Sequence, residues 1–298
     1  MIGKILRRIG RIQQQVLIKI GVVQIETRTI DRLREHYETE KLLAKKLRNS
    51  TEQQRKYLYA TLYDELFASV PDHPCLTRKI SRDRERSISA EMKLLKPFLR
   101  KNIVFTEIGP GDCALCFEVA TCVKRAIGID VSRVVAKSDR QPANCELLFV
   151  EDGTSIPLAP ATVHVAYSNQ VMEHLHPDDA KNQLTNICSA LVPRGIYICI
   201  TPNRLIGPHD ISRFFEDHAT GFHLKEYTYR ELRSVFGAAG FSGLEALLGY
   251  GRVYLRIPLA PLILLETMLS RLPSSVLKDI RESMLLRLLL RGAVIATK

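Results

Sequence analysis

The chain has 298 residues, of which 46% are hydrophobic and 25% are charged, and this balance excludes a disordered or fibrous protein. The length is sufficient for one large hydrophobic core or two smaller ones. The net charge of +11 is uneven: Lys/Arg and Asp/Glu number 23 and 12 in residues 1–101, 12 and 17 in residues 102–250, and 8 and 3 in residues 251–298. The two basic flanks therefore either contact an anionic partner or present a solvated basic surface.

The first predicted element is a basic amphipathic helix over residues 1–24, with apolar residues at helical spacing. Its charges exclude a transmembrane span, and no small-residue cleavage site indicates a secretory signal. Such a helix lies on an anionic membrane, pairs with a partner helix or covers its own chain, and we favour the packed alternatives slightly.

Further helices are expected before the first strand, and we interpret residues 1–100 as a basic helical extension. Ser50 or Thr51 is a suitable N-cap for one of them. The expected helices cover residues 29–47, 52–70 and 90–99, with a polar connector over residues 81–87.

The most informative segment is an apolar run, Ile103–Ile108, that passes directly into a glycine turn. An apolar helical pattern follows, so we predict a buried strand, a tight turn and a helix. Gly109 and Gly111 allow a sharp turn and a close approach of a ligand to the backbone. The helix start offers unpaired N–H groups to an anionic group. Turns of this kind at the carboxyl edge of a parallel sheet bind cofactors.

A second acid indicates that the cofactor contains a ribose. Residues 125–130 are predicted to form the next strand, which ends in Asp130, about 20 residues after the turn, where a carboxylate suits a ribose diol. Gly109, Gly111 and Ala114 also fit a dinucleotide fingerprint, so an NAD-dependent oxidoreductase is an alternative. Glu107 favours another cofactor, because its carboxylate could meet a cationic amino group.

Two later segments extend this pattern. Asp152-Gly153 follows a third strand-like run, and Asp152 could meet an adenine amine. A fourth strand-like run begins at Val163 and continues into the polar loop Ser168–His174.

Over roughly residues 100–250 the sequence resembles the class I S-adenosylmethionine-dependent methyltransferases, especially the broad type 11 group that contains the quinone-biosynthesis methyltransferases. The order and spacing of several motifs carry this resemblance: Glu107–Gly111, Ile129-Asp130, Glu151–Gly153, Ser168–His174, Leu191–Asn203 and Tyr227–Phe241.

The resemblance implies an α/β, Rossmann-like fold with a seven-stranded, mostly parallel sheet and one antiparallel strand near its edge, here with the helical N-terminal extension. It implies S-adenosyl-L-methionine as cofactor. Glu107, Gly109 and Gly111 match residues that line its methionine end, Asp130 matches the residue that holds the ribose, and Asp152 matches the residue beside the adenine. Val131, Gly153 and Asn169 complete the expected cofactor-binding residues. Cys113 departs from the pattern, because many relatives have a third glycine there.

The seven cysteines are scattered, most of them in apolar runs. Cys113 and Cys116 have the C-x-x-C form, but no second pair completes a zinc site. We interpret the cysteines as reduced thiols of a cytoplasmic protein, with peripheral contact to the inner face of a membrane as an alternative.

Methyl transfer requires alignment of acceptor, methyl and sulfur and, for some acceptors, removal of a proton. His174 and His223 are the preferred candidates for the base, because imidazole titrates near neutral pH, and Asp210 is a weaker one. The loop over residues 204–223 carries histidines and aromatic side chains that suit an acceptor pocket at the carboxyl edge of the sheet, with a plain surface loop as the alternative.

Some relatives bind a divalent metal through an E-x-x-E-H pattern and a later histidine. Here Gln170 replaces the first carboxylate before Glu173-His174, and an amide is a weaker ligand for a hard cation. His209 or His223 could complete such a site, but we predict no metal.

Residues 101–250 are thus the predicted methyltransferase core, and residues 251–298 are predicted to add an apolar and basic helical insertion and a last strand. The apolar runs within 256–290 are too short to span a bilayer; core packing is favoured over dimerisation, membrane contact or capping of the pocket.

We expect in-line transfer of the sulfonium methyl to a hydroxyl of a glycan or lipid-linked sugar, because the basic, apolar flanks suit such a partner. The alternatives are O- or C-methylation of a quinone-like or other small molecule, NAD-dependent oxidation, and a non-catalytic protein that binds a membrane or partner. Nucleic acid is not the expected partner.

Overall fold

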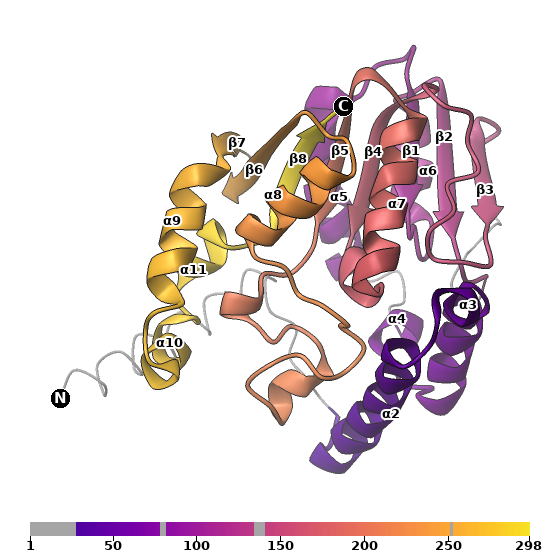
Figure 1. The fold of residues 1–298 in the computed structure, drawn as a ribbon. Coiled ribbons are helices and arrows are strands. Elements are labelled where there is room, and N and C mark those ends of the chain that lie inside the picture. Colours follow the sequence, from indigo (N-terminus) through magenta and orange to yellow (C-terminus); the bar gives the residue numbers. More distant parts are fainter. Residues whose placement is uncertain (1–27, 78–81, 134–140, 251–252) are drawn as a thin grey trace.

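The computed structural model describes residues 28–77, 82–133, 141–250 and 253–298, so the helix predicted over residues 1–24 lies outside the described part. A mixed sheet of eight strands occupies the centre of the molecule, in the order β3-β2-β1-β4-β5-β8-β6-β7 (Figure 1). The strands are β1 Val104–Ile108, β2 Arg125–Asp130, β3 Cys145–Phe149, β4 Val163–Asn169, β5 Leu191–Ile200, β6 Gly243–Tyr250, β7 Val253–Pro258 and β8 Ala293–Thr297.

The strands β1 to β5 are parallel to one another, whereas β8 runs antiparallel to both of its neighbours, β5 and β6. The predicted fold class is therefore confirmed. The chain leaves β1 toward β2 and β3 on one side and returns to β4 on the other, which creates a switch point at the carboxyl ends of β1 and β4. Open α/β sheets bind their ligands at such a point.

The expected number of seven strands was wrong, because β7 adds an antiparallel edge strand to β6. The apolar run that begins at Arg256 predicts a helix over the second half of β7, as part of the helical insertion expected within residues 251–298. Pro258 separates the two structures: its ring removes a backbone donor, and the helix α9 begins only at Leu259.

Helices cover both faces of the sheet (Figure 1). Helices α7, Pro177–Ala190, and α8, Tyr229–Ala238, lie in front in this view, and α5, Arg82–Leu95, and α6, Ala114–Ala120, lie behind. Each layer has its own hydrophobic core: Leu184, Leu232 and Tyr197 belong to one cluster, and Leu95 and Leu115 belong to the other.

The segment predicted to be a polar connector, residues 81–87, belongs to α5 from Arg82 onward, so this expectation was wrong. Its polar side chains have partners that the sequence pattern does not reveal. The Arg84 guanidinium donates two hydrogen bonds to Asp112, at 2.8 and 2.5 Å, and Ser87 donates one to Glu91.

Two N-terminal helices follow the prediction closely: α2, Ile30–Arg48, and α3, Glu52–Ser69. Thr51 forms a reciprocal capping box with Gln54, which satisfies two of the unpaired N–H groups at the helix start. A buried ion pair between Arg55 of α3 and Asp179 of α7 holds these helices against the core.

Three helices precede β8, as expected for the C-terminal part: α9 Leu259–Leu269, α10 Ser274–Ile280 and α11 Met284–Leu289. The buried carboxylate of Glu266 accepts hydrogen bonds from Asn203 and from the backbone N–H of Tyr229, and so joins α9 to α8. Among the described residues, no helix has the length and apolar character that crossing a membrane requires. The remaining short elements are α4 Pro74–Thr77 and the 3-10 turns Lys96–Phe98, Met172–His174, Arg204–Ile206 and Ile211–Phe214.

Candidate active site

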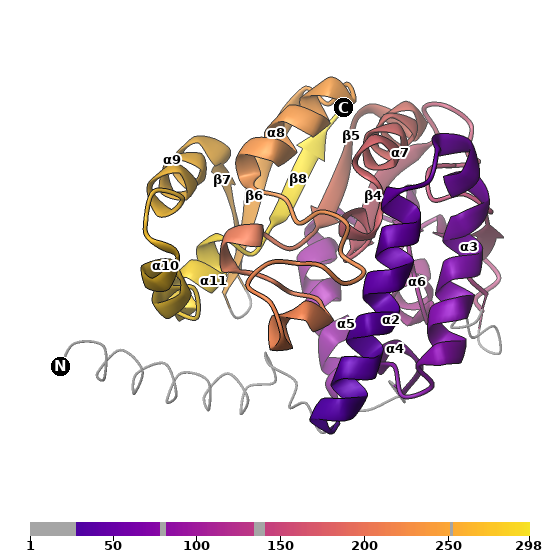
Figure 2. The same ribbon diagram turned by 60° about the horizontal axis from the view of Figure 1, so that its bottom comes forward.

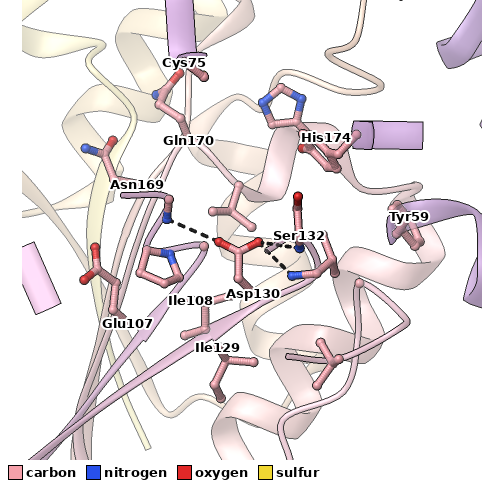
Figure 3. Close-up of a pocket in the computed structure, with 18 of the residues that line it drawn as sticks. Tyr59, Cys75, Glu107, Ile108, Ile129, Asp130, Ser132, Asn169, Gln170 and His174 are labelled. Atoms are coloured by element: carbon pink, nitrogen blue, oxygen red, sulfur yellow. Dashed lines mark hydrogen bonds between the residues drawn. The ribbon is translucent and has the colours of Figure 1, made fainter. Parts of the chain in front are cut away.

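A cavity of about 450 Å³ opens at the switch point between β1 and β4 (Figure 3). Its lining includes all eight residues predicted to bind the cofactor, and one of the three predicted catalytic residues, His174, lies among them. The eight are Glu107, Gly109, Gly111, Asp130, Val131, Asp152, Gly153 and Asn169. The acids and glycines of three separate segments therefore meet in one place.

The glycine turn needs glycine for two different reasons. Gly109 has φ of +67°, and a Cβ there would come within 2.5 Å of Cγ2 of Val171. Gly111 has φ of +53°, and a Cβ there would meet no atom within 4 Å, so its backbone borders open space that a ligand can approach. Cys113 adopts a left-handed conformation as well, with φ of 61°, and its thiol is buried.

The Asp130 carboxylate is fixed by the backbone around it. It accepts hydrogen bonds from the N–H groups of Gly111, at 3.2 Å, Val131, at 2.7 Å, and Ser132, at 3.1 Å, as Figure 3 shows. Burial raises the pKa of Asp130, and these three hydrogen bonds oppose that rise. The glycine turn thus positions the acid at the end of β2.

Glu107 is a buried acid that lacks a full set of partners. Its Oε2 makes no hydrogen bond with any residue that the structure describes, and only 5% of the residue is exposed. Burial, and then the nearby charge of Glu91, raise the pKa of Glu107 well above its usual range. A buried, unpartnered carboxylate beside a cavity is a site that a cationic ligand would satisfy.

Asp152, unlike Glu107, has several hydrogen-bond partners. Its carboxylate accepts hydrogen bonds from the backbone and hydroxyl groups of both Thr154 and Ser155. Burial raises the pKa of Asp152, but these bonds outweigh it and hold the pKa below its usual range. Oδ2 accepts only one of the four bonds, so this oxygen has capacity for a ligand donor.

His174 enters the cavity from the turn after β4 (Figure 3). Its Nδ1 lies 3.0 Å from the carbonyl oxygen of Phe222, so Nδ1 donates and the Nε2 lone pair has no hydrogen-bond partner among the described residues. Burial and the charge of His223 lower the pKa of His174 to about 3. This imidazole is therefore neutral at neutral pH.

The second candidate base, His223, does not line the cavity but lies behind His174, with ring centroids 4.9 Å apart. Burial disfavours its charged form, but the hydrogen bond with Glu226, at 2.9 Å, outweighs this and raises the pKa of His223 to about 9. Burial also raises the pKa of Glu173, to about 7. At neutral pH, His174 is therefore uncharged and the neighbouring His223 is positively charged.

Asp210, the third candidate, is absent from the cavity lining. It caps a short turn, and its carboxylate accepts hydrogen bonds from Ser212 and from the backbone N–H of Gly221. No residue of the loop 204–223 lines this cavity, contrary to the expectation that the loop forms an acceptor pocket.

Aromatic side chains reach the cavity from the N-terminal helix α3 instead: Tyr59, Tyr63 and Phe67. Helix α5 adds Arg84, Ser87 and Glu91 to the same lining. Sequence reasoning missed both groups. The helical spacing of the three rings was a visible signal that they share one face, but nothing local indicated what that face contacts.

Two groups of side chains have the spacing of metal ligands within the described part of the chain. One is Glu173, His174 and His223, the set in which His223 joins the Glu173-His174 pair considered in the sequence. In the other, His36 and His73 both accept hydrogen bonds at Nδ1, so both direct an Nε2 proton toward Glu40. That second group is satisfied without an ion.

Residues 106–199 match the model of a family described as a methyltransferase domain. No curated protein matches the chain.

Several solved structures are similar in fold. A putative methyltransferase of Haloferax volcanii, solved in complex with the activator Trm112, is 13% identical over 72% of this chain and 93% of that chain, with a TM-score of 0.46. An S-adenosylmethionine-dependent methyltransferase of Mesorhizobium loti is 14% identical over 70% and 98%, with a TM-score of 0.45. Phosphoethanolamine N-methyltransferase 1 of Haemonchus contortus is 13% identical over 62% and 40%, with a TM-score of 0.49.

Proposed function

We propose that this chain is an S-adenosylmethionine-dependent methyltransferase, since residues 106–199 match the methyltransferase domain family, and that it methylates a hydroxyl group of a sugar in a glycan or lipid-linked intermediate. The cofactor supplies a methyl group activated by its positively charged sulfur. The observation that carries the hydroxyl acceptor is His174 in the cavity lining, whose Nδ1 is engaged by the Phe222 carbonyl and whose Nε2 has no hydrogen-bond partner among the described residues.

The residues of the cavity fit the cofactor. The buried Oε2 of Glu107 lacks a partner, and an ammonium group would satisfy it. Asp130 would accept from the ribose hydroxyls, and Asp152 has capacity on Oδ2 for the adenine amine. The open space beside Gly111 leaves room for the ligand to approach the backbone.

His174 would accept the proton of the hydroxyl group. Its Nδ1–H is held by the Phe222 carbonyl, which fixes the tautomer and leaves Nε2 as the acceptor. An oxygen of Glu173 lies within 4.8 Å of a nitrogen of His174, so Glu173 is the neighbouring group that could take on this proton, since His223 is already protonated at neutral pH. Because the pKa of Glu173 is about 7, its carboxylate is the group whose protonation changes near neutral pH.

The size of the cavity supports a large acceptor that enters only in part. A volume of about 450 Å³ is in the range of sites for one small molecule. A glycan or lipid-linked acceptor would therefore enter this cavity with its reacting end only. The rings of Tyr63 and Phe67 offer apolar faces on which a sugar ring could pack.

The test is transfer of a labelled methyl group from S-adenosylmethionine to a panel of glycosides, lipid-linked sugars and quinols. We expect label in the sugar fractions, and a loss of roughly a hundredfold in kcat for His174→Ala, since general-base catalysis contributes roughly 10²–10⁴-fold. Cofactor affinity, measured by calorimetry, should stay within about twofold for this variant.

His218→Ala is the matched control, because His218 is an exposed histidine of the loop 204–223. Label that appears only in the quinols would contradict the sugar acceptor. Full activity of His174→Ala would contradict its role as the base.

A further inference from the structure

Exposed apolar side chains gather in the C-terminal part of the molecule. Of the eleven large hydrophobic side chains that are exposed in the described part of the chain, seven lie between residues 255 and 285: Leu255, Leu264, Met268, Leu272, Val276, Met284 and Leu285. Single exposed apolar residues are normal on a soluble protein. A cluster of this kind marks an interaction surface.

The fold brings these side chains to one region. Helices α9, α10 and α11 lie together on one side of the molecule, beside the end of the sheet that β6 and β7 form, as Figures 1 and 2 both show. Helix α9 buries Leu262 and Ile263 in the core, whereas Leu264 and Met268 are each 57% exposed. The helix is therefore apolar on its outer side as well, and no described residue covers that side.

The net charge around this surface is positive. Residues 253–298 contain seven Lys/Arg and three Asp/Glu, and one of these acids, Glu266, is buried beneath α9. Arg256, Lys278 and Arg287 form ion pairs with Glu245, Asp217 and Glu282, and Lys298 donates to backbone carbonyls, so the positive charge without an ion pair among the described residues lies on Arg271, Arg281 and Arg291. Arg271 and Arg291 are exposed and form no ion pair among the residues described, and Arg271 directly precedes the exposed Leu272.

We propose that α9, α10 and α11 form a docking face for an anionic lipid bilayer. Apolar side chains such as Leu264 and Leu285 would enter the region between headgroups and acyl chains, and the surrounding arginines would neutralise lipid phosphates. Apolar centres with a net positive rim fit this partner, because the bilayer offers both hydrocarbon and negative charge.

The docking face is joined to the loop that follows β5. Arg281 of this face donates a hydrogen bond of 2.8 Å to the carbonyl oxygen of Gly207, and Lys278 forms an ion pair of 2.7 Å with Asp217. A docked enzyme would therefore hold this loop near the membrane surface. Access to a lipid-linked acceptor rests on the proposed function, whereas docking itself requires neither acceptor nor methyl transfer.

The experiment is co-sedimentation of the full chain with vesicles of phosphatidylcholine alone or of phosphatidylcholine mixed with phosphatidylglycerol. We expect sedimentation with the anionic vesicles only, weakened by salt. The double variant Leu264→Asp/Leu285→Asp should lose roughly tenfold or more in vesicle affinity. The matched control is Leu42→Asp/Tyr57→Asp on α2 and α3, since these side chains are similarly exposed, at 65% and 66%, and should change nothing.

Thermal unfolding of each variant shows whether it folds, and Arg271→Glu provides a second test that leaves the apolar surface intact. Its vesicle affinity should also fall and its methyl transfer in solution should not change. Failure of the wild type to sediment with anionic vesicles, or full binding by Leu264→Asp/Leu285→Asp, would overturn the proposal. So would a dimer in analytical ultracentrifugation that the same variant dissociates while vesicle binding is absent.

Discussion

Asp179 offers a direct test of whether the N-terminal helices are part of the folded core. Its carboxylate accepts hydrogen bonds from the Arg55 guanidinium, at 2.5 and 2.9 Å, and from the Tyr59 hydroxyl, at 2.6 Å. The side chains of Arg55 and Asp179 are only 5% and 3% exposed. The substitution Asp179→Asn keeps the volume but leaves the Arg55 charge buried without its counter-ion.

Breaking a buried ion pair by removing one partner costs about 3–5 kcal/mol. A typical domain has only about 5–15 kcal/mol of unfolding free energy, so this loss is large. Asp178→Asn is the control on the same turn, since the Asp178 side chain is 79% exposed. We expect that change to cost less than about 1 kcal/mol.

Urea unfolding followed by circular dichroism measures both variants. Because Tyr59 lines the cavity, calorimetric titration of S-adenosylmethionine should also show weaker binding to Asp179→Asn. Equal unfolding free energies for the two variants would refute the reasoning. So would an unfolding free energy of Asp179→Asn within about 0.5 kcal/mol of the wild type.

Four further predictions concern the site. Glu107→Gln should weaken S-adenosylmethionine binding by roughly 10- to 100-fold in calorimetry, the scale of a charge-assisted hydrogen bond, and a stability loss in place of an affinity loss would contradict this role. Gly109→Ala should destabilise the protein in urea unfolding by about 1–3 kcal/mol because of its positive φ, whereas Gly237→Ala in α8, with no atom within 4 Å of its Cβ, should be neutral or stabilising by about 0.5–1 kcal/mol. The pKa of His223 is raised to about 9, so its contribution to stability is complete below about pH 6.5 and is lost as pH rises through 9; His223→Gln should remove up to about 3 kcal/mol at pH 6 and much less at pH 10, and an equal effect at both pH values would argue against the charged pair. Since the pKa of Glu173 is about 7, kcat should rise as pH increases through 7, and Glu173→Gln should abolish that rise in a pH–rate profile.

The cofactor end of the site was predictable because its signals are local. Asp130 ends a strand and is held by backbone groups one or two residues away and by Gly111 in the preceding turn. Glycine permits the left-handed conformations that Gly109 and Gly111 adopt. Such features extend over a few residues, so composition and spacing reveal them.

The acceptor end was predicted less well. His174 was identified, but its neutral state depends on burial and on the charge of His223, almost 50 residues later in the chain. The loop 204–223 was expected to line the cavity because it follows a strand at the carboxyl edge. Its polar groups instead bond to one another and to α2, as the hydrogen bond from the Phe222 backbone to Glu40 shows.

By itself, the sequence determined the strands β1 to β4, the glycine turn, the acids that follow the strands and the start of α3 at Ser50 or Thr51, because backbone conformation and hydrophobic periodicity act between near neighbours. Only the tertiary structure decided that Tyr63 and Arg84 of the N-terminal helices close the cavity and that β7 extends the sheet. It also decided which of two adjacent histidines carries a charge. Burial and long-range pairing set these outcomes, and both depend on residues that are distant in sequence.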